Sequence, residues 1–160
     1  MTKQGLILAA GLGKRMAPLS NNLSKSLLPV AGRPFIEWQI TALIQSGVER
    51  IGIVSRKENE DFKKKIGDGT RYGIEIEYII QEEQSGTADA LLKAEKQMNG
   101  DFYCLNGDVI VSSETLMLLD KKENGMAIVE VDDVSAYGCI EIVNGTVAKI
   151  IEKENTGKGM

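Results

Sequence analysis

A glycine-rich loop with two cations is the stretch of this sequence best suited to chemistry. Residues 5–16 read GLILAAGLGKRM, so an apolar run opens at Gly11 into a loop carrying Lys14 and Arg15, and Lys25 follows closely. Glycines let the backbone approach an anion and offer N–H donors, and arginine and lysine bind phosphate oxygens. The loop therefore indicates a phosphate site. Taken alone, it is equally compatible with an ordinary strand-to-helix turn that carries surface cations.

The loop matches neither of the two common phosphate-binding motifs. Met16 stands where the third glycine of GxGxxG would be, and the four-residue spacing of a Walker A loop is missing. Gly11 and Gly13 still permit close approach of an anion.

Two later segments add further polar candidates. Gln81 opens the segment QEEQSGTADA, and its amide has both a donor and an acceptor for the edge of a uracil or thymine base. A polar cap before the next helix is the alternative for this segment. Asp108 follows an apolar run in the sequence LNGD and could hold Mg²⁺, which prefers oxygen ligands. An Asp-Gly turn without function is the alternative there.

Composition narrows the remaining chemistry. The chain has 160 residues, a net charge of −4 and no histidine, which argues against a general nucleic-acid binder and excludes histidine bases and triads. Cys104 and Cys139 lie in apolar runs without metal-binding spacing, which predicts buried thiols in a reducing compartment. No apolar stretch approaches the length of a membrane span. We expect a cytoplasmic protein without nucleic-acid or membrane partners.

Elements of alternating type must position these residues. Short β-rich runs predict strands at Leu6–Ala10, Ile51–Ser55, Ile74–Ile80, Phe102–Leu105, Met126–Val131, Cys139–Val143 and Val147–Ile151. Helical patterns cover residues 35–47, Lys57–Ile66, Ala88–Met98 and Ser113–Lys122. This order predicts an α/β fold, a Rossmann-like doubly wound and mostly parallel sheet with helices on both faces, and Asn144-Gly145 predicts a C-terminal β-hairpin. Ligands then bind beyond the carboxyl ends of the strands.

The opening segment resembles the signature of the sugar-1-phosphate nucleotidyltransferases. That pattern contains LAAGxGTR, then PKxLxPV, then GxP. The chain departs from it at Lys14, where threonine is usual, and at Ser24, where proline is usual. QEEQSGTADA, LNGD, Tyr137-Gly138 and Ile151-Glu152-Lys153 are similar to later segments of the family, with Glu154 in place of a proline.

The resemblance implies roles for individual residues. Catalysis would rest on Arg15, Lys25 and Asp108, with Asp108 also the Mg²⁺ ligand. Nucleotide binding would involve Leu8, Ala10, Gly11, Gly13, Lys14, Gln81, Gly86 and Thr87. The sugar phosphate would be bound by Gly138, Glu152 and Lys153, although the last two also fit the plain end of a strand.

The predicted function is transfer of a nucleotidyl group from UTP or dTTP to a sugar-1-phosphate, with release of pyrophosphate. Residues 1–160 would form one incomplete nucleotidyltransferase domain, since the family continues past the segment containing Lys153 with a second acidic Mg²⁺ ligand. We therefore expect nucleotide binding with weak or no turnover. Alternatives are another phosphorylated substrate (inositol phosphate, phosphocholine, or mannose-1-phosphate with a purine nucleotide), a non-catalytic regulatory module, and an unrelated nucleotide binder. A homo-oligomer is left open.

Overall fold

The structure is a computed structural model that describes residues 2–11, 13, 16, 23–56, 60–83, 85–133 and 138–151. The chain divides into two compact units, Met1–Gly125 and Met126–Met160. Each unit is described by itself.

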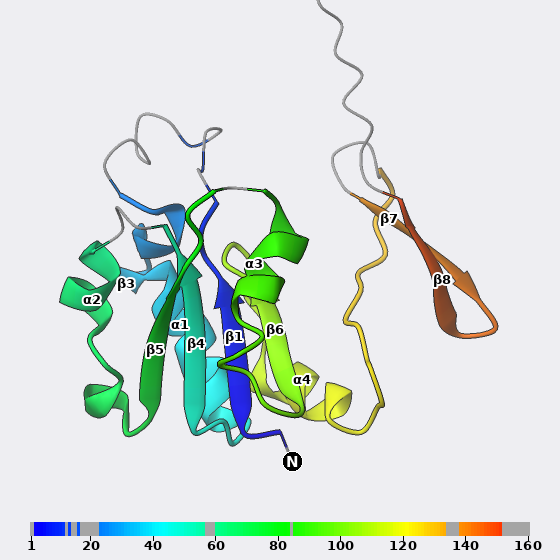
Figure 1. Ribbon diagram of the computed structural model, residues 1–160. Helices are drawn as coiled ribbons and strands as arrows, with labels where there is room; N and C mark the ends of the chain where they lie inside the picture. Colours follow the sequence, from blue (N-terminus) through cyan, green and yellow to red (C-terminus); the bar gives the residue numbers. More distant parts are fainter. Residues whose placement is uncertain are drawn as a thin grey trace, which may run out of the picture. The chain divides into compact units, whose positions relative to one another are not determined.

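A four-stranded sheet organises the first unit (Figure 1). Its order is β5 (Glu75–Ile80), β4 (Arg50–Ser55), β1 (Gln4–Leu8) and β6 (Phe102–Asn106), and every neighbouring pair is parallel. In the register, Leu8 lies opposite Val54 on one side and Asn106 on the other. Parallel strands separated by helices were the prediction, and it is confirmed. The first strand ends two residues earlier than expected, so Ala9 and Ala10 follow it.

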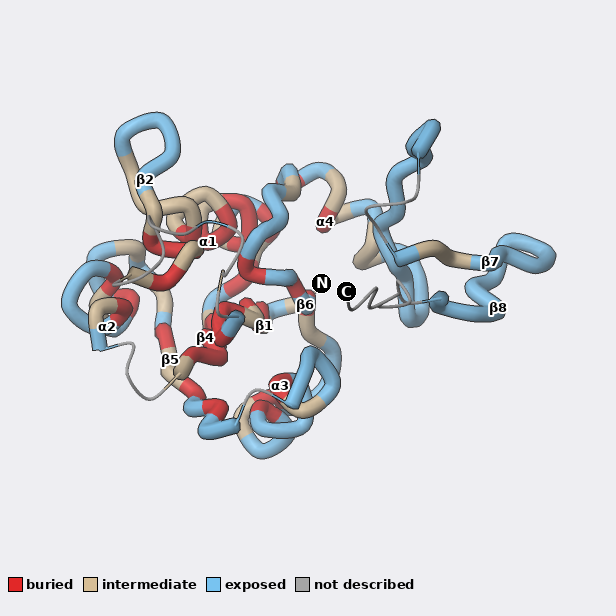
Figure 2. The backbone as a smooth tube through the Cα atoms, turned by 90° about the horizontal axis from the view of Figure 1, so that it is seen from above, coloured by how far each residue is buried: buried red, intermediate tan, exposed pale blue. Residues whose placement is uncertain are grey.

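Helices cover both faces of this sheet, because alternate residues of β1 and β4 point to opposite sides. Ile7, Ile51 and Ile53 pack in one buried cluster with residues of α1 (Phe35–Gln45), α2 (Asp61–Ile66) and α4 (Ser113–Leu119). Leu6 and Val54 pack in the other with α3 (Thr87–Lys93) and the turns that follow it. The buried segments gather along the sheet in Figure 2. All four helices are shorter than the sequence patterns predicted.

Short elements complete the first unit. They are the 3₁₀ turns η2 (Lys25–Leu27) and η3 (Thr70–Tyr72), and the two-residue strands β2 (Pro29–Val30) and β3 (Arg33–Pro34). β2 and β3 pair antiparallel around Ala31 and Gly32, both with positive φ.

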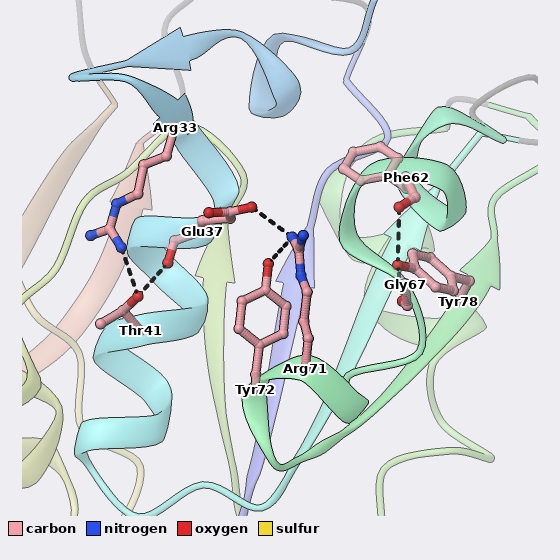
Figure 3. A network of polar contacts seen from close by, with 8 residues as sticks. All are labelled: Arg33, Glu37, Thr41, Phe62, Gly67, Arg71, Tyr72 and Tyr78. Carbon is pink, nitrogen blue, oxygen red and sulfur yellow. Dashed lines mark hydrogen bonds and ion pairs between the residues drawn. The ribbon is translucent and has the colours of Figure 1, made fainter.

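Polar contacts tie these connections to the helices (Figure 3). Arg71 in η3 forms an ion pair with Glu37 of α1 at 2.6 Å, and it also donates to the Tyr72 hydroxyl. The Tyr78 hydroxyl on β5 donates to Gly67 O at 2.6 Å. The segment between α2 and β5 is thereby bonded to β5 at Gly67 and to α1 at Arg71.

The second unit contains a β-hairpin formed by β7 (Cys139–Val143) and β8 (Thr146–Ile151). Asn144 and Gly145 join the strands with φ of 52° and 76°, the left-handed pair that a two-residue hairpin turn requires. This prediction is confirmed. A register shift occurs between Glu141 and Ile142.

One face of the hairpin is entirely apolar. Ile140 pairs with Ile150 and Ile142 with Val147, and residues that lie opposite each other share a face. All six residues of β8 are exposed.

Two predictions from the sequence are wrong. Residues 126–131 form no strand, and their apolar side chains are largely exposed, as for Val129 at 82%. β-Branched residues favour strands only where a neighbouring strand receives them, and the described residues provide none for this segment. The thiols are not buried either, since Cys104 is exposed and Cys139 partly so. Cys104 lies on β6, which has only one neighbour, β1, among the described strands.

No helix within the described ranges has both the length and the apolar character that crossing a membrane requires.

Candidate functional site

The candidate site lies where β1 and β6 end side by side. The chain continues from β1 into Ala9–Gly11 and from β6 into Gly107-Asp108. The turn η2 lies against the segment after β6, because the Ser26 hydroxyl donates to Gly107 O at 2.7 Å, and Gly107 N donates to Leu8 O at the end of β1. Three segments far apart in the sequence therefore meet at the carboxyl edge of the sheet, where ligands of open α/β sheets bind.

Lys25 and Asp108 form an ion pair in this site. Lys25 Nζ lies 2.5 Å from Asp108 Oδ2, and the two side chains are 25% and 54% exposed. Both charges are therefore within reach of a dissolved ligand. The sequence predicted both residues as catalytic, and the structure brings them together across 83 positions of sequence.

Gly107 is required by close packing of the backbone. A Cβ at this position would lie 2.7 Å from Leu8 O, 2.9 Å from Ala9 Cα and 2.9 Å from Ser26 Oγ. Gly107 N also donates to Leu8 O at 2.9 Å. The glycine before Asp108 thus lets the ends of β1 and β6 approach each other.

Asp108 sits in a turn that a buried glutamine holds. Val109 N donates to Asn106 O at 3.1 Å, which closes the turn. Gln39 Nε2, from the middle of α1, donates to Asn106 O at 2.8 Å and to Val109 O at 2.6 Å. The carboxylate of Asp108 therefore projects from a turn that is bonded at both ends to one fully buried side chain.

Gln81 is engaged within its own loop. It follows β5 and is 3% exposed, and its Nε2 donates to Gly86 O at 3.1 Å and to Asp89 Oδ2 at 2.7 Å. Gly86, with φ of 98°, precedes α3, which begins at Thr87. The amide nitrogen thus links the end of β5 to the start of α3. It acts as a donor and does not cap the helix, whose first turn has no side-chain cap bond.

The described residues of the first loop, which do not include Lys14 and Arg15, offer main-chain groups and no polar side chain. Ala10 is buried in the cluster under α3, and Leu8 is only partly exposed against the same cluster. Gly11 is exposed, and a Cβ there would meet nothing within 4 Å. Gly13 has φ of 61° and accepts a hydrogen bond from Met16 N at 2.8 Å. Any contact of Ala10 with a nucleotide would have to use its main chain.

Several predicted site residues cannot be placed here. Lys14, Arg15, Glu152 and Lys153 lie outside the described residues. Gly138 is described and directly precedes β7 in the second unit.

Sequence reasoning missed three residues that hold the site together: Ser26, Gln39 and Asp89. Gln39 left a detectable signal, because it stands three residues after Ile36 and four before Leu43, on the apolar side of α1. A glutamine at such a position needs internal partners.

Asp108 offers a carboxylate to a divalent cation at this site. No group of three or more His, Cys, Asp or Glu side chains in the described part of the chain is arranged to hold a metal ion. Mg²⁺ in phosphate-transfer sites is commonly bound by one or two carboxylates together with substrate phosphates and water. Asp108 therefore fits Mg²⁺ that arrives with a nucleotide, and it does not form a metal centre by itself.

Comparison with known proteins identifies the family of this chain. The family model described as nucleotidyl transferase matches residues 4–158. The chain belongs to this family.

Individual relatives support the assignment. The bifunctional protein GlmU of Methanococcus vannielii is 39% identical over 151 residues, which cover 94% of this chain and 35% of that protein. The glucose-1-phosphate thymidylyltransferase of Xanthomonas campestris is 33% identical over 160 residues, which cover 94% of this chain and 54% of that protein. The chain thus spans between about a third and about a half of the length of these relatives.

The fold also matches solved structures. A Bacillus anthracis structure assigned as a glucose-1-phosphate thymidylyltransferase, in complex with sucrose, superimposes with a TM-score of 0.78 at 28% identity, over 94% of this chain and 64% of that one. A UDP-glucose pyrophosphorylase complexed with UDP-glucose has a TM-score of 0.72 at 23% identity, over 97% of this chain and 70% of that one, and shares the fold.

Proposed function

We propose that this chain supplies the nucleotide-binding part of a sugar-1-phosphate nucleotidyltransferase that uses UTP or dTTP. Membership of the nucleotidyl transferase family supports the reaction class. The observation that carries the proposal is the pairing of Lys25 with Asp108 at the shared end of β1 and β6. This pair offers a cation for phosphate and a carboxylate for a metal ion in one place.

In the proposed reaction, a phosphate oxygen of the sugar-1-phosphate attacks the α-phosphorus of the nucleotide. The bond from that phosphorus to the oxygen bridging to the β-phosphate breaks, and pyrophosphate leaves with the electron pair. Such transfers depend on alignment and charge neutralisation more than on covalent catalysis. Lys25 would bind the α-phosphate, and Arg15 would compensate the negative charge of the leaving pyrophosphate. Lys153 would bind the phosphate of the incoming sugar-1-phosphate. The absence of histidine from the sequence is no obstacle to this chemistry.

Asp108 would hold Mg²⁺ in this scheme. The ion supplies positive charge to the phosphates while it is bound. Before the nucleotide arrives, the Lys25–Asp108 contact compensates both charges within the protein.

Gln81 is proposed to form hydrogen bonds with the edge of the pyrimidine base, together with the backbone near Gly86. Its Nε2 is already bonded to Gly86 O and Asp89 Oδ2. Reading a base through that nitrogen therefore requires one of these two bonds to open.

A second candidate is a purine nucleotide combined with mannose-1-phosphate. It is compatible with a mannose-1-phosphate guanylyltransferase of Mycobacterium tuberculosis, which is 30% identical over 141 residues, 84% of this chain and 39% of that protein, but it is not favoured, since the relatives described above are more similar to this chain. A nucleotide panel separates the two candidates.

Calorimetric titration with UTP, dTTP, GTP and ATP in the presence of Mg²⁺ tests the proposal. We expect UTP or dTTP to bind, and Lys25→Met to weaken binding by about tenfold or more, because a charge-assisted hydrogen bond to phosphate is lost. Turnover, followed as pyrophosphate release with a panel of sugar-1-phosphates, is expected to be weak or absent.

Lys3→Met is the matched control for this experiment. Lys3 also forms an exposed lysine–carboxylate pair, with Glu49, but at the opposite end of β1. Both variants should melt close to the wild type, since exposed ion pairs contribute about 0–1 kcal/mol. A folded wild-type protein that binds none of the four nucleotides would contradict the proposed function.

A further inference from the structure

We propose that Gln39 is a positioning residue for Asp108: the buried Gln39 amide fixes the turn that presents the Asp108 carboxylate to Mg²⁺. The inference rests on the proposed function and adds to it a residue outside the sequence motifs. Gln39 does not touch the site itself. It acts on the main chain on both sides of Asp108.

The geometry of the turn supports this role. Asn106 O accepts from Val109 N at 3.1 Å and from Gln39 Nε2 at 2.8 Å, and Val109 O accepts from the same nitrogen at 2.6 Å. One amide group therefore spans the two residues that bracket Gly107-Asp108. The Ser26 hydroxyl holds the carbonyl of Gly107, between them, at 2.7 Å.

The burial of Gln39 shows that packing alone does not explain an amide here. The side chain is 0% exposed, and its Oε1 has no hydrogen-bond partner among the residues that the structure describes. A buried acceptor without a donor costs about 1–3 kcal/mol. An apolar side chain of similar length would fill the same space without this cost, so the two bonds made by Nε2 are what the glutamine contributes.

Fixing a metal-binding carboxylate is a known use of such contacts. Hydrogen-bonding groups that orient a metal-ligating side chain change metal affinity by about tenfold to a hundredfold when they are removed. Gln39 sits on α1, a helix of 11 residues packed on the sheet, and so provides a rigid support for the turn.

The test measures UTP affinity by calorimetry over a series of Mg²⁺ concentrations, with EDTA as the zero point. Gln39→Met keeps the length and apolar bulk of the side chain but removes both donors. We expect this variant to need about tenfold to a hundredfold more Mg²⁺ to reach half of the metal-dependent gain in affinity. Its UTP affinity in EDTA should match the wild type, because Lys25 is unchanged.

Gln45→Met, an exposed position at the end of the same helix, is the matched control and should leave the Mg²⁺ midpoint unchanged. Gln39→Asn is the second variant, since it keeps an amide that is too short to reach the turn, and it should shift the midpoint in the same direction. A purely structural role would lower the melting temperature without moving the midpoint.

The outcomes separate the two proposals. If the wild type binds UTP with Mg²⁺ and both Gln39 variants keep its midpoint, the positioning role is wrong while the proposed function stands. If neither Gln39 variant folds, the residue serves the core and the positioning role is likewise wrong. If the folded wild type shows no Mg²⁺-dependent binding of UTP, the proposed function and the role of Gln39 fall together.

Discussion

Single residues of the site are constrained by main-chain packing as much as by chemistry. Gly107 is the clearest case, because main-chain atoms of β1 and the hydroxyl of Ser26 fill the space where a side chain would be. Gly11, in the loop after β1, has open space at the corresponding position. Two glycines that look alike in the sequence therefore differ in how much a substitution disturbs them.

Gly107→Ala is predicted to destabilise the protein by about 1–3 kcal/mol, since an added methyl group in a packed site forces the backbone to shift. Gly11→Ala should change stability little. Urea unfolding of both variants checks this prediction, and equal midpoints would contradict it.

Part of the site could be predicted residue by residue, and part could not. Lys25 was noted as a cation that closely follows the glycine-rich loop, and Asp108 as an aspartate at the carboxyl end of a strand. The family resemblance implied their catalytic roles, and the structure pairs the two side chains. The internal partner of Gln81 was not foreseen, since its bond to Asp89 depends on how the loop folds back onto α3. Partners of this kind are set by loop geometry that local sequence patterns do not encode.

Among the elements, β5 shows how one side chain joins neighbouring segments. Tyr78 lies in the middle of β5, and its hydroxyl donates to Gly67 O just after α2 (Figure 3). Burial raises the pKa of Tyr78 from 10.0 to about 12. The folded state therefore retains this proton at a pH where the unfolded chain has lost it.

Stability should consequently fall as the pH rises from 10 to 12, because the unfolded state ionises Tyr78 first and is favoured by doing so. Below pH 10 Tyr78 is protonated in both the folded and the unfolded state, so the stability gained from keeping Tyr78 neutral is fully present. Tyr78→Phe is predicted to lose about 1 kcal/mol at neutral pH with the hydrogen bond, and to show a shallower decline at alkaline pH. Thermal melts of both proteins across this range, with tyrosinate absorbance, check the prediction. Parallel declines would contradict it.

Element types were predicted well where a partner strand exists and poorly where none does. The strands of the parallel sheet and the hairpin turn at Asn144-Gly145 agree with their patterns. Residues 126–131 have the same β-rich composition without forming a strand. Propensity for a strand becomes structure only through hydrogen bonds to a neighbour.

For the molecule as a whole, the buried apolar clusters lie in one of the two units. Within the described ranges, both clusters are built from residues before Gly125. The β7–β8 hairpin instead exposes Ile142, Val147 and Ile150. A two-stranded hairpin is marginally stable in water when nothing covers its apolar side.

Residues 1–125, expressed alone, are therefore predicted to keep a cooperative thermal unfolding transition. A peptide of residues 126–160 should show no stable strand signal by circular dichroism. A non-cooperative melt of the longer fragment, or a stable hairpin in the peptide, would contradict this division of stability.

The order of strands in the sheet also governs when the site can exist during synthesis. β1 is synthesised before β4 and β6, yet it lies between them, and Gln4 pairs with both Arg50 and Phe102. Lys25 must likewise wait until Asp108 has left the exit tunnel. The nascent chain therefore carries Lys25 without the carboxylate beside it until Asp108 has been made, and a ligand that binds both residues can favour folding only after that point.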